Sequence, residues 1–128
     1  MKVSLELGGK APAIVFADAD LDLAVKSVTD SRLIFSGQVC NCAERVYVHS
    51  SIYEPFMEKL ATAFKAAKIG NPMSDPAPAY STQVDKAQQR KIDTMVKRAV
   101  ADGCEVVTGG KIPEMEAGYL KHGSMVRA

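Results

Sequence analysis

The sequence predicts an α/β fold in which a parallel sheet is covered by helices. Short apolar segments alternate with longer segments of helical periodicity, and glycines or prolines separate them. Strands that alternate with helices are joined by crossover connections and therefore pair in parallel. The composition, 47% hydrophobic and 24% charged over 128 residues, is that of an ordinary globular domain.

The first third of the chain predicts two strands and a helix. Residues 3–7 alternate apolar and polar side chains, a glycine pair follows, and residues 13–17 form a second apolar run. Negative charge then marks a helix start, and apolar residues recur at helical spacing up to a stop at Gly37. The acidic residues are Asp18, Asp20 and Asp22.

The remainder predicts two more strands and two more helices. Residues 45–49 alternate and are rich in β-branched and aromatic side chains, as in a strand. Ser51 and Glu54 have capping-box spacing at the start of a long helix that is expected to end at Gly70. A proline-rich loop over residues 71–78 precedes a helix over residues 83–101.

Beyond that helix the sequence pattern predicts secondary structure less clearly. Gly103 is expected to cap the helix, and residues 104–108 form a short apolar strand before the Gly109-Gly110 turn. Residues 112–128 have little periodicity and are expected to be irregular. No internal repeat or low-complexity segment is present.

Charge and hydropathy exclude several partner classes. The chain has 16 basic and 15 acidic residues, a net charge of +1, so it presents no field that favours nucleic acid or an anionic membrane. No apolar run approaches the roughly 20 residues of a membrane span, and the first residues lack a signal peptide's apolar stretch. A soluble cytoplasmic protein is expected.

The three cysteines are expected to be reduced thiols. Cys40 and Cys42 are separated by one residue, too close for an unstrained disulfide, and Cys104 has no obvious partner. The two histidines show no ligand spacing with the cysteines, so no metal site is expected. Packing is the simpler role for Cys42 and Cys104, although oxidative pairing with another thiol would let Cys42 protect Cys40.

Cys40 and Glu6 are the residues that fit a catalytic role. Cys40 lies on a turn between a helix and a strand, where functional side chains gather, but a free cysteine is more commonly a small buried residue. Glu6 precedes a glycine pair, and a carboxylate becomes an effective base when apolar neighbours desolvate it. The residues around Lys10 match neither the Walker pattern nor a dinucleotide fingerprint.

Two segments resemble signatures of the aldehyde dehydrogenase family. The glutamate signature is similar to LELGGKAP at residues 5–12, and the cysteine signature is similar to SGQVCNCA at residues 36–43. Their separation, 34 positions from Glu6 to Cys40, also agrees with the family. The sequence NCAERVYV at residues 41–48 most resembles that of the lactaldehyde and glycolaldehyde dehydrogenase branch.

The resemblance implies a mechanism and a set of site residues. Cys40 would be the nucleophile and Glu6 the general base in oxidation of a small aldehyde to a carboxylic acid. Leu7 and Gly8 would face the nicotinamide end of NAD or NADP. Val39 and Asn41 would be walls of the substrate pocket. Relatives assemble as dimers or tetramers, so a homo-oligomer is expected.

The resemblance also defines the domain content and what stays open. Residues 1–128 are expected to be part of the catalytic domain of such an enzyme, without its Rossmann-like cofactor domain. AYST at residues 79–82 replaces a Gly-Pro-Leu type of motif, and GYLKH at residues 118–122 departs from the aromatic-proline segment of relatives. Two other readings are a non-catalytic remnant or interaction module and a cofactor-free thiol esterase. The aldehyde and the choice between NAD and NADP are not specified.

Overall fold

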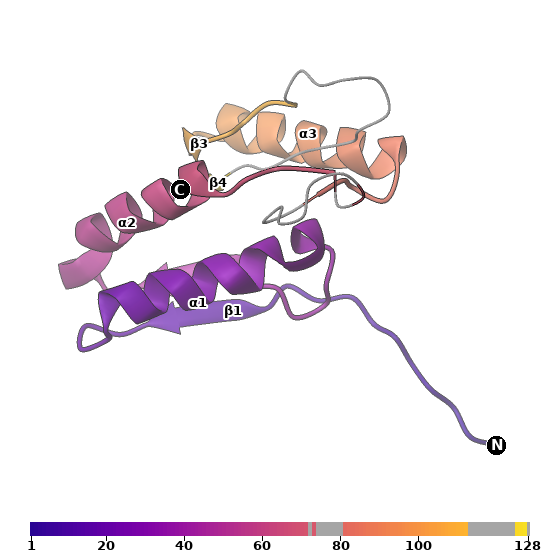
Figure 1. Ribbon diagram of the computed structural model, residues 1–128, viewed down its shortest axis with the longest axis horizontal. Coiled ribbons are helices and arrows are strands. Elements are labelled where there is room, and N and C mark those ends of the chain that lie inside the picture. The colour runs from indigo at the N-terminus through magenta and orange to yellow at the C-terminus, as the bar shows by residue number, and fades with distance from the viewer. Residues whose placement is uncertain (72, 74–80, 113–124, 128) are drawn as a thin grey trace.

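A computed structural model of the chain describes residues 1–71, 73, 81–112 and 125–127, the last three by their backbone only. Two short sheets and three helices make up this part of the molecule (Figure 1). Most of the predicted loop over residues 71–78 and most of the expected irregular stretch over residues 112–128 lie outside the described residues. The elements are β1 Pro12–Val15, α1 Leu21–Leu33, η1 Ile34–Gly37, β2 Arg45–Val48, η2 Ser50–Ile52, α2 Tyr53–Ala66, α3 Lys86–Ala101, β3 Glu105–Thr108 and β4 Met125–Arg127.

Strands β1 and β2 pair in parallel, which confirms the predicted α/β fold. Val15 is opposite Val48, and the intervening helix α1 makes the crossover between the two strands. Side chains alternate along each strand, so Val15 is buried whereas Ile14 is 62% exposed and Tyr47 is 53% exposed. Helices α1 and α2 lie side by side over the inward face (Figure 1).

The core lies between this sheet and the two helices. It is formed by Val15 of β1, two valines of α1 and two large residues of α2, and Phe56 is completely buried. Burial of side chains this large contributes about 1.5–3 kcal/mol each. The remaining members are Val25, Val28 and Leu60.

Helix α1 begins where the acidic residues predict it. The Asp20 carboxylate accepts a hydrogen bond of 3.0 Å from the backbone N–H of Leu23 and so caps the first turn. The helix ends at Leu33, four residues before the predicted stop at Gly37, and the chain tightens into the 3₁₀ turn η1.

The start of helix α2 differs from the prediction, because the expected capping box does not form. Ser51 belongs to the 3₁₀ turn η2, where its hydroxyl lies 2.9 Å from Nδ1 of His49, and the helix itself starts at Tyr53 without a side-chain cap. The histidine ring competes for the serine hydroxyl and the box does not form. The helix also ends at Ala66 instead of Gly70.

Helix α3 is capped at both ends. The Asp85 carboxylate accepts a hydrogen bond of 2.7 Å from Gln88 N–H at the start. At the other end Gly103 adopts a φ of 97°, and Cys104 N–H donates to the Ala99 carbonyl at 2.9 Å. Only a glycine takes this left-handed conformation without strain, so Gly103 caps the helix as predicted.

The last strand differs from the predicted irregular tail. Residues Met125–Arg127 form β4, which pairs antiparallel with β3. This second sheet therefore departs from purely parallel pairing. The weak alternation of three residues gives little signal in the sequence because the pairing itself defines the strand.

Residues 3–7 form no strand, and the prediction of one there was wrong. The first residues extend away from the body of the molecule as an arm (Figure 1), and all of residues 1–10 are exposed. A strand needs a hydrogen-bonding partner along its edge, and no other described segment lies against this arm as a strand. Alternation of apolar and polar residues is therefore not sufficient by itself to form a strand.

Candidate active site

Cys40 occupies an exposed tight turn between α1 and β2. The N–H of Cys42 donates to the carbonyl of Val39 at 3.1 Å, which closes a four-residue turn with Cys40 and Asn41 as its central residues. Cys40 is exposed, Val39 is half-buried and Asn41 is exposed. The thiol of Cys40 is therefore accessible on a turn that two secondary-structure elements hold in place.

Cys42 and Cys104 have different surroundings from Cys40. Cys42 is 1% exposed, and its sulfur lies 4.0 Å from the Ile34 carbonyl oxygen. The adjacent Ala43 N–H donates to the Ser31 hydroxyl at 3.1 Å. Cys104 is half-buried at the end of α3. Cys42 is therefore the thiol that packs within the structure, and Cys40 is the exposed one.

The turn before Cys40 has an unusual backbone. Phe35, Ser36 and Gly37 have φ values of 47°, 58° and 77° in succession. Left-handed conformations are uncommon for non-glycine residues and costly for a bulky one such as Phe35. Backbone strain of this kind persists only where surrounding contacts determine it, so contacts to this turn are part of the site.

The arm that carries the glutamate signature meets the cysteine turn at Gly9. A Cβ added to Gly9 would lie 2.4 Å from the Cys40 carbonyl oxygen, whereas one added to Gly8 would meet nothing within 4 Å. The backbone of Gly9 is thus packed directly against the backbone of Cys40. The structure brings the two signatures together at this point.

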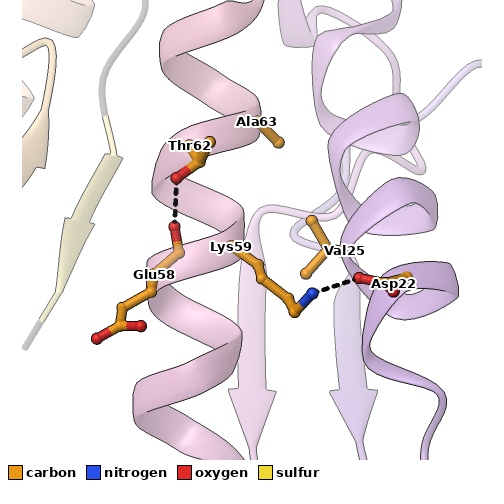
Figure 2. A pocket seen from close by; sticks show the side chains of 6 residues that line it. All are labelled: Asp22, Val25, Glu58, Lys59, Thr62 and Ala63. Atoms are coloured by element: carbon orange, nitrogen blue, oxygen red, sulfur yellow. Dashed lines mark hydrogen bonds and ion pairs between the residues drawn. The ribbon is translucent and has the colours of Figure 1, made fainter.

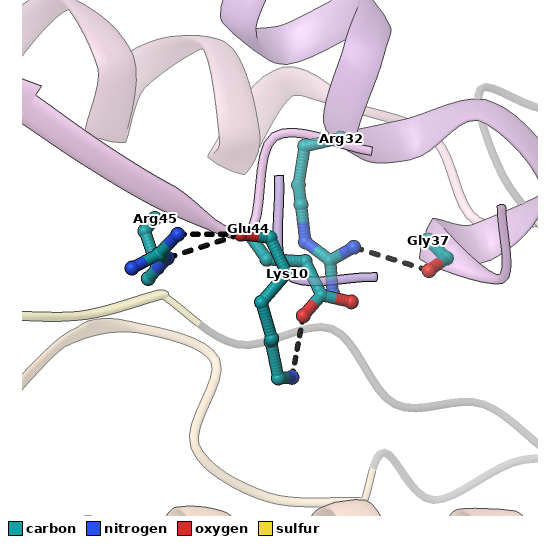
Figure 3. A network of polar contacts seen from close by, with 5 residues as sticks. All are labelled: Lys10, Arg32, Gly37, Glu44 and Arg45. Carbon is teal, nitrogen blue, oxygen red and sulfur yellow. Dashed lines mark hydrogen bonds and ion pairs between the residues drawn. The ribbon is translucent and has the colours of Figure 1, made fainter. Parts of the chain in front are cut away.

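Polar contacts fasten the end of the arm to the start of β2 (Figure 3). The Arg45 guanidinium donates to the Lys10 carbonyl from Nε at 3.0 Å and from Nη2 at 2.9 Å. The Lys10 ammonium pairs with Glu44, and the Ala11 carbonyl accepts from Glu44 N–H at 3.1 Å. Arg32 donates to the Gly37 carbonyl at 3.2 Å. Both sides of the Gly9 contact are therefore tied in place.

Glu6 itself is not placed against Cys40. Its neighbours Leu5 and Leu7 are 71% and 70% exposed, so they do not desolvate the Glu6 carboxylate in this structure. Gly9 lies three positions after Glu6, and three residue steps of extended chain span about 10 Å. The described contacts fix Gly9 and Lys10 beside the cysteine turn and leave the earlier residues of the arm exposed.

A cavity of about 1150 Å³ opens beside the cysteine turn. Gly8, Val39 and Cys40 line it among the predicted site residues, whereas Glu6, Leu7 and Asn41 do not. Part of its wall is apolar and comes from α2 and α3. Those residues include Phe56, Leu60, Phe64, Ile92, Met95 and Val96.

A second hollow lies apart from the signatures, between α1 and α2 (Figure 2). Lys59 of α2 pairs with Asp22 of α1 across it at 2.6 Å, and both side chains are largely exposed. An exposed ion pair of this kind contributes at most about 1 kcal/mol. None of the predicted site residues lines this hollow, so it is a surface feature of helix packing.

A set of hydrogen bonds behind the cysteine turn was not foreseen from the sequence. The Gln38 amide donates to the Thr82 carbonyl at 3.3 Å and accepts from Val84 N–H at 2.8 Å. Ser36 bonds to residues of the same segment through its hydroxyl and its carbonyl. Contacts between residues more than 40 positions apart leave no periodic pattern in the sequence. The position of Gln38 within the cysteine signature was the one sequence feature that pointed to these hydrogen bonds.

On this α/β scaffold, an exposed cysteine on a strained turn lies beside a glycine-containing arm and a partly apolar cavity. Residues 1–127 match the model of the aldehyde dehydrogenase family, and the chain belongs to this family. The family assignment agrees with both signatures.

Individual relatives show how much of such a protein the chain represents. Lactaldehyde dehydrogenase of Escherichia coli (strain K12) is 51% identical over 118 residues, which cover 92% of this chain and 25% of that protein. A crystal structure of lactaldehyde dehydrogenase from Escherichia coli aligns with a TM-score of 0.89 at 48% identity, covering 94% of this chain and 25% of the other. The chain thus spans about a quarter of the length of these relatives.

A further solved structure contains a nicotinamide cofactor. Betaine aldehyde dehydrogenase from Staphylococcus aureus, in complex with NAD+, aligns with a TM-score of 0.88 at 31% identity. The alignment covers 94% of this chain and 24% of that structure. The fold described above is therefore that of the corresponding quarter of aldehyde dehydrogenases.

None of the helices in the described part of the chain combines the length and apolar character that a membrane crossing requires. Among the same residues, no three histidine, cysteine, aspartate or glutamate side chains are grouped as metal ligands would be.

Proposed function

We propose that the protein containing this sequence oxidises a small aldehyde to a carboxylic acid, with NAD or NADP as hydride acceptor. Cys40 is the nucleophile and Glu6 is the general base. The observation that carries the proposal is the contact between Gly9 and Cys40, because it joins the two signatures at one exposed thiol beside a cavity.

The Cys40 thiolate attacks the carbonyl carbon of the aldehyde and forms a thiohemiacetal. As the carbonyl oxygen gains negative charge, the backbone N–H of Cys40 stabilises it. The accessible position of Cys40 on its turn supports this role. Loss of hydride from the former carbonyl carbon then leaves a thioester on Cys40.

NAD or NADP, when bound, would supply the hydride acceptor for this oxidation. Leu7 and Gly8 are proposed to hold its nicotinamide end. Gly8 supports this assignment, because a Cβ there would meet nothing and Gly8 lines the same cavity as Cys40. NAD+ is present in the related Staphylococcus aureus structure.

Glu6 accepts a proton from water, which attacks the thioester and releases the carboxylic acid with regeneration of the Cys40 thiol. This step requires the arm before Gly9 to bring the carboxylate towards Cys40. The fastening of Lys10 by Arg45 and Glu44 leaves residues 1–8 as the part of the arm that makes this approach.

The proposed substrate is lactaldehyde or glycolaldehyde, bound between Val39 and Asn41. The similarity to lactaldehyde dehydrogenase supports this choice. The proposed assembly is a homo-oligomer in the cytoplasm. Ile14 and Tyr47 on the uncovered face of β1 and β2 are the apolar surface that an oligomer or further polypeptide would cover.

The test uses the protein that contains this sequence, with lactaldehyde and NAD+. Cys40→Ala is expected to abolish NADH formation, and Glu6→Gln is expected to slow steady-state turnover more than about a hundredfold while retaining a first burst of NADH. Cys104→Ala is the control and should keep wild-type turnover. Wild-type oxidation by Cys40→Ala would refute the proposal. Ester hydrolysis that requires Cys40, without any NADH formation, would indicate the thiol esterase instead.

A further inference from the structure

The segment that leads into α3, residues 81–84, lies against the cysteine turn and makes four hydrogen bonds to it, and a fifth hydrogen bond lies within the turn itself. Two involve Ser36: its hydroxyl accepts from Ser81 N–H at 3.0 Å, and its carbonyl accepts from the Gln83 amide at 3.3 Å. The three others involve the Gln38 amide, which reaches the carbonyl of Thr82, the N–H of Val84 and, within the turn, the carbonyl of Phe35 at 3.0 Å.

Gln38 and Gln83 together form what we call the amide clamp. Gln83 is 3% exposed, so its contact to Ser36 is shielded from water, whereas Gln38 is exposed and uses both ends of its amide. A buried amide is retained at the cost of desolvation, and its hydrogen bonds are correspondingly expensive to lose. The clamp holds the two carbonyls of Phe35 and Ser36, the non-glycine residues with left-handed backbones.

We propose that the amide clamp positions Cys40, and that Gln83 is a positioning residue although it lies 43 positions beyond the thiol. A turn with three successive positive φ values relaxes unless other contacts hold it. The clamp provides such contacts at Phe35 and Ser36, which precede Cys40 in the chain, whereas Gly9 contacts Cys40 itself. Because the inference concerns how the nucleophile is held, it rests on the proposed function.

The test replaces each clamp amide by methionine, which is similar in length and donates no hydrogen bond. Gln83→Met and Gln38→Met are made in the protein that contains this sequence. Lys97→Met is the control, since Lys97 is exposed on α3 and its ion pair with Asp93 lies within that helix. Iodoacetamide alkylation of Cys40 is followed across pH by mass spectrometry of the peptide, and kcat and KM are measured with lactaldehyde and NAD+.

Each clamp variant is expected to change the Cys40 alkylation rate at least about fivefold and to lower kcat about 10-fold to 100-fold, because small displacements of a reacting group have effects of this size. KM for the aldehyde should stay within about threefold, a split that general destabilisation does not produce. Lys97→Met should stay within twofold in all three measurements.

Urea unfolding shows which variants are folded. If Gln83→Met does not fold, Gln38→Met carries the test, since its side chain is exposed. A folded clamp variant that keeps either its alkylation rate or its kcat within twofold of wild type overturns the proposal. Alkylation does not depend on oxidation. Failure of the proposed function, seen as oxidation by Cys40→Ala, is therefore distinguishable from failure of the clamp.

Discussion

Gly9 and Cys40 are in backbone contact: a methyl group on Gly9 would lie 2.4 Å from the Cys40 carbonyl oxygen. No real Cβ contact is this short, and the obstacle is backbone that the neighbouring turn and strand hold. The requirement at Gly9 is therefore for space and not for unusual dihedral angles. The contact makes the glycine pair of the first signature part of the support for the second.

Gly9→Ala is expected to destabilise the protein by about 1–3 kcal/mol, because the arm or the turn must shift to admit the methyl group. Gly8→Ala is the matched control and should change stability by less than about 0.5 kcal/mol, since a Cβ there meets nothing. Urea unfolding midpoints of the two variants give the comparison. Equal midpoints would show that the Gly9 contact is not held in solution.

Much of the fold follows from patterns in the sequence. The strands β1 and β2 and the three helices all have an apolar period that matches their structure, and Asp20 caps α1 where the acidic residues indicated. Parallel pairing followed from the helix between the two strands. Periodicity reports which side of an element is buried, and that is sufficient for elements that bury one side.

The arm shows where such reasoning stops. Residues 3–7 alternate as well as residues of β2 do, yet only β2 has a strand beside it. Alternation describes two faces of a strand and contains no information about whether a partner is present at its edge. Likewise Ser51 has capping-box spacing, but His49 engages its hydroxyl.

The sequence predicted residues for the candidate site, but it did not predict the contacts that support the cysteine turn. Cys40 and Gly8 were identified from the signatures and line one cavity. The amide clamp was not identified, because Gln83 is in the sequence an ordinary polar residue near a helix start. Its role depends on burial and on a partner carbonyl 47 positions away.

The two neighbouring cysteines are expected to react very differently. Cys40 is exposed and Cys42 is 1% exposed, so iodoacetamide should alkylate Cys40 at least about tenfold faster in the folded protein. Both lie in one tryptic peptide, in which fragment ions distinguish them. In urea the difference should disappear. Equal rates in the folded protein would mean that the turn opens readily and that Cys42 is not a packing residue.

Phe35→Asn is expected to stabilise the protein by about 0.5–1 kcal/mol. Phe35 has a φ of 47° and is 78% exposed, so its ring contributes little burial to offset the strain of a bulky left-handed residue. Asparagine adopts this conformation at lower cost. Phe16→Asn is the control, because Phe16 is 67% exposed and is not among the residues with positive φ. Urea unfolding should give a higher midpoint for Phe35→Asn and an unchanged or lower one for Phe16→Asn. A lower midpoint for both variants would contradict the prediction. It would mean that contacts of the Phe35 ring stabilise the protein by more than the backbone strain destabilises it.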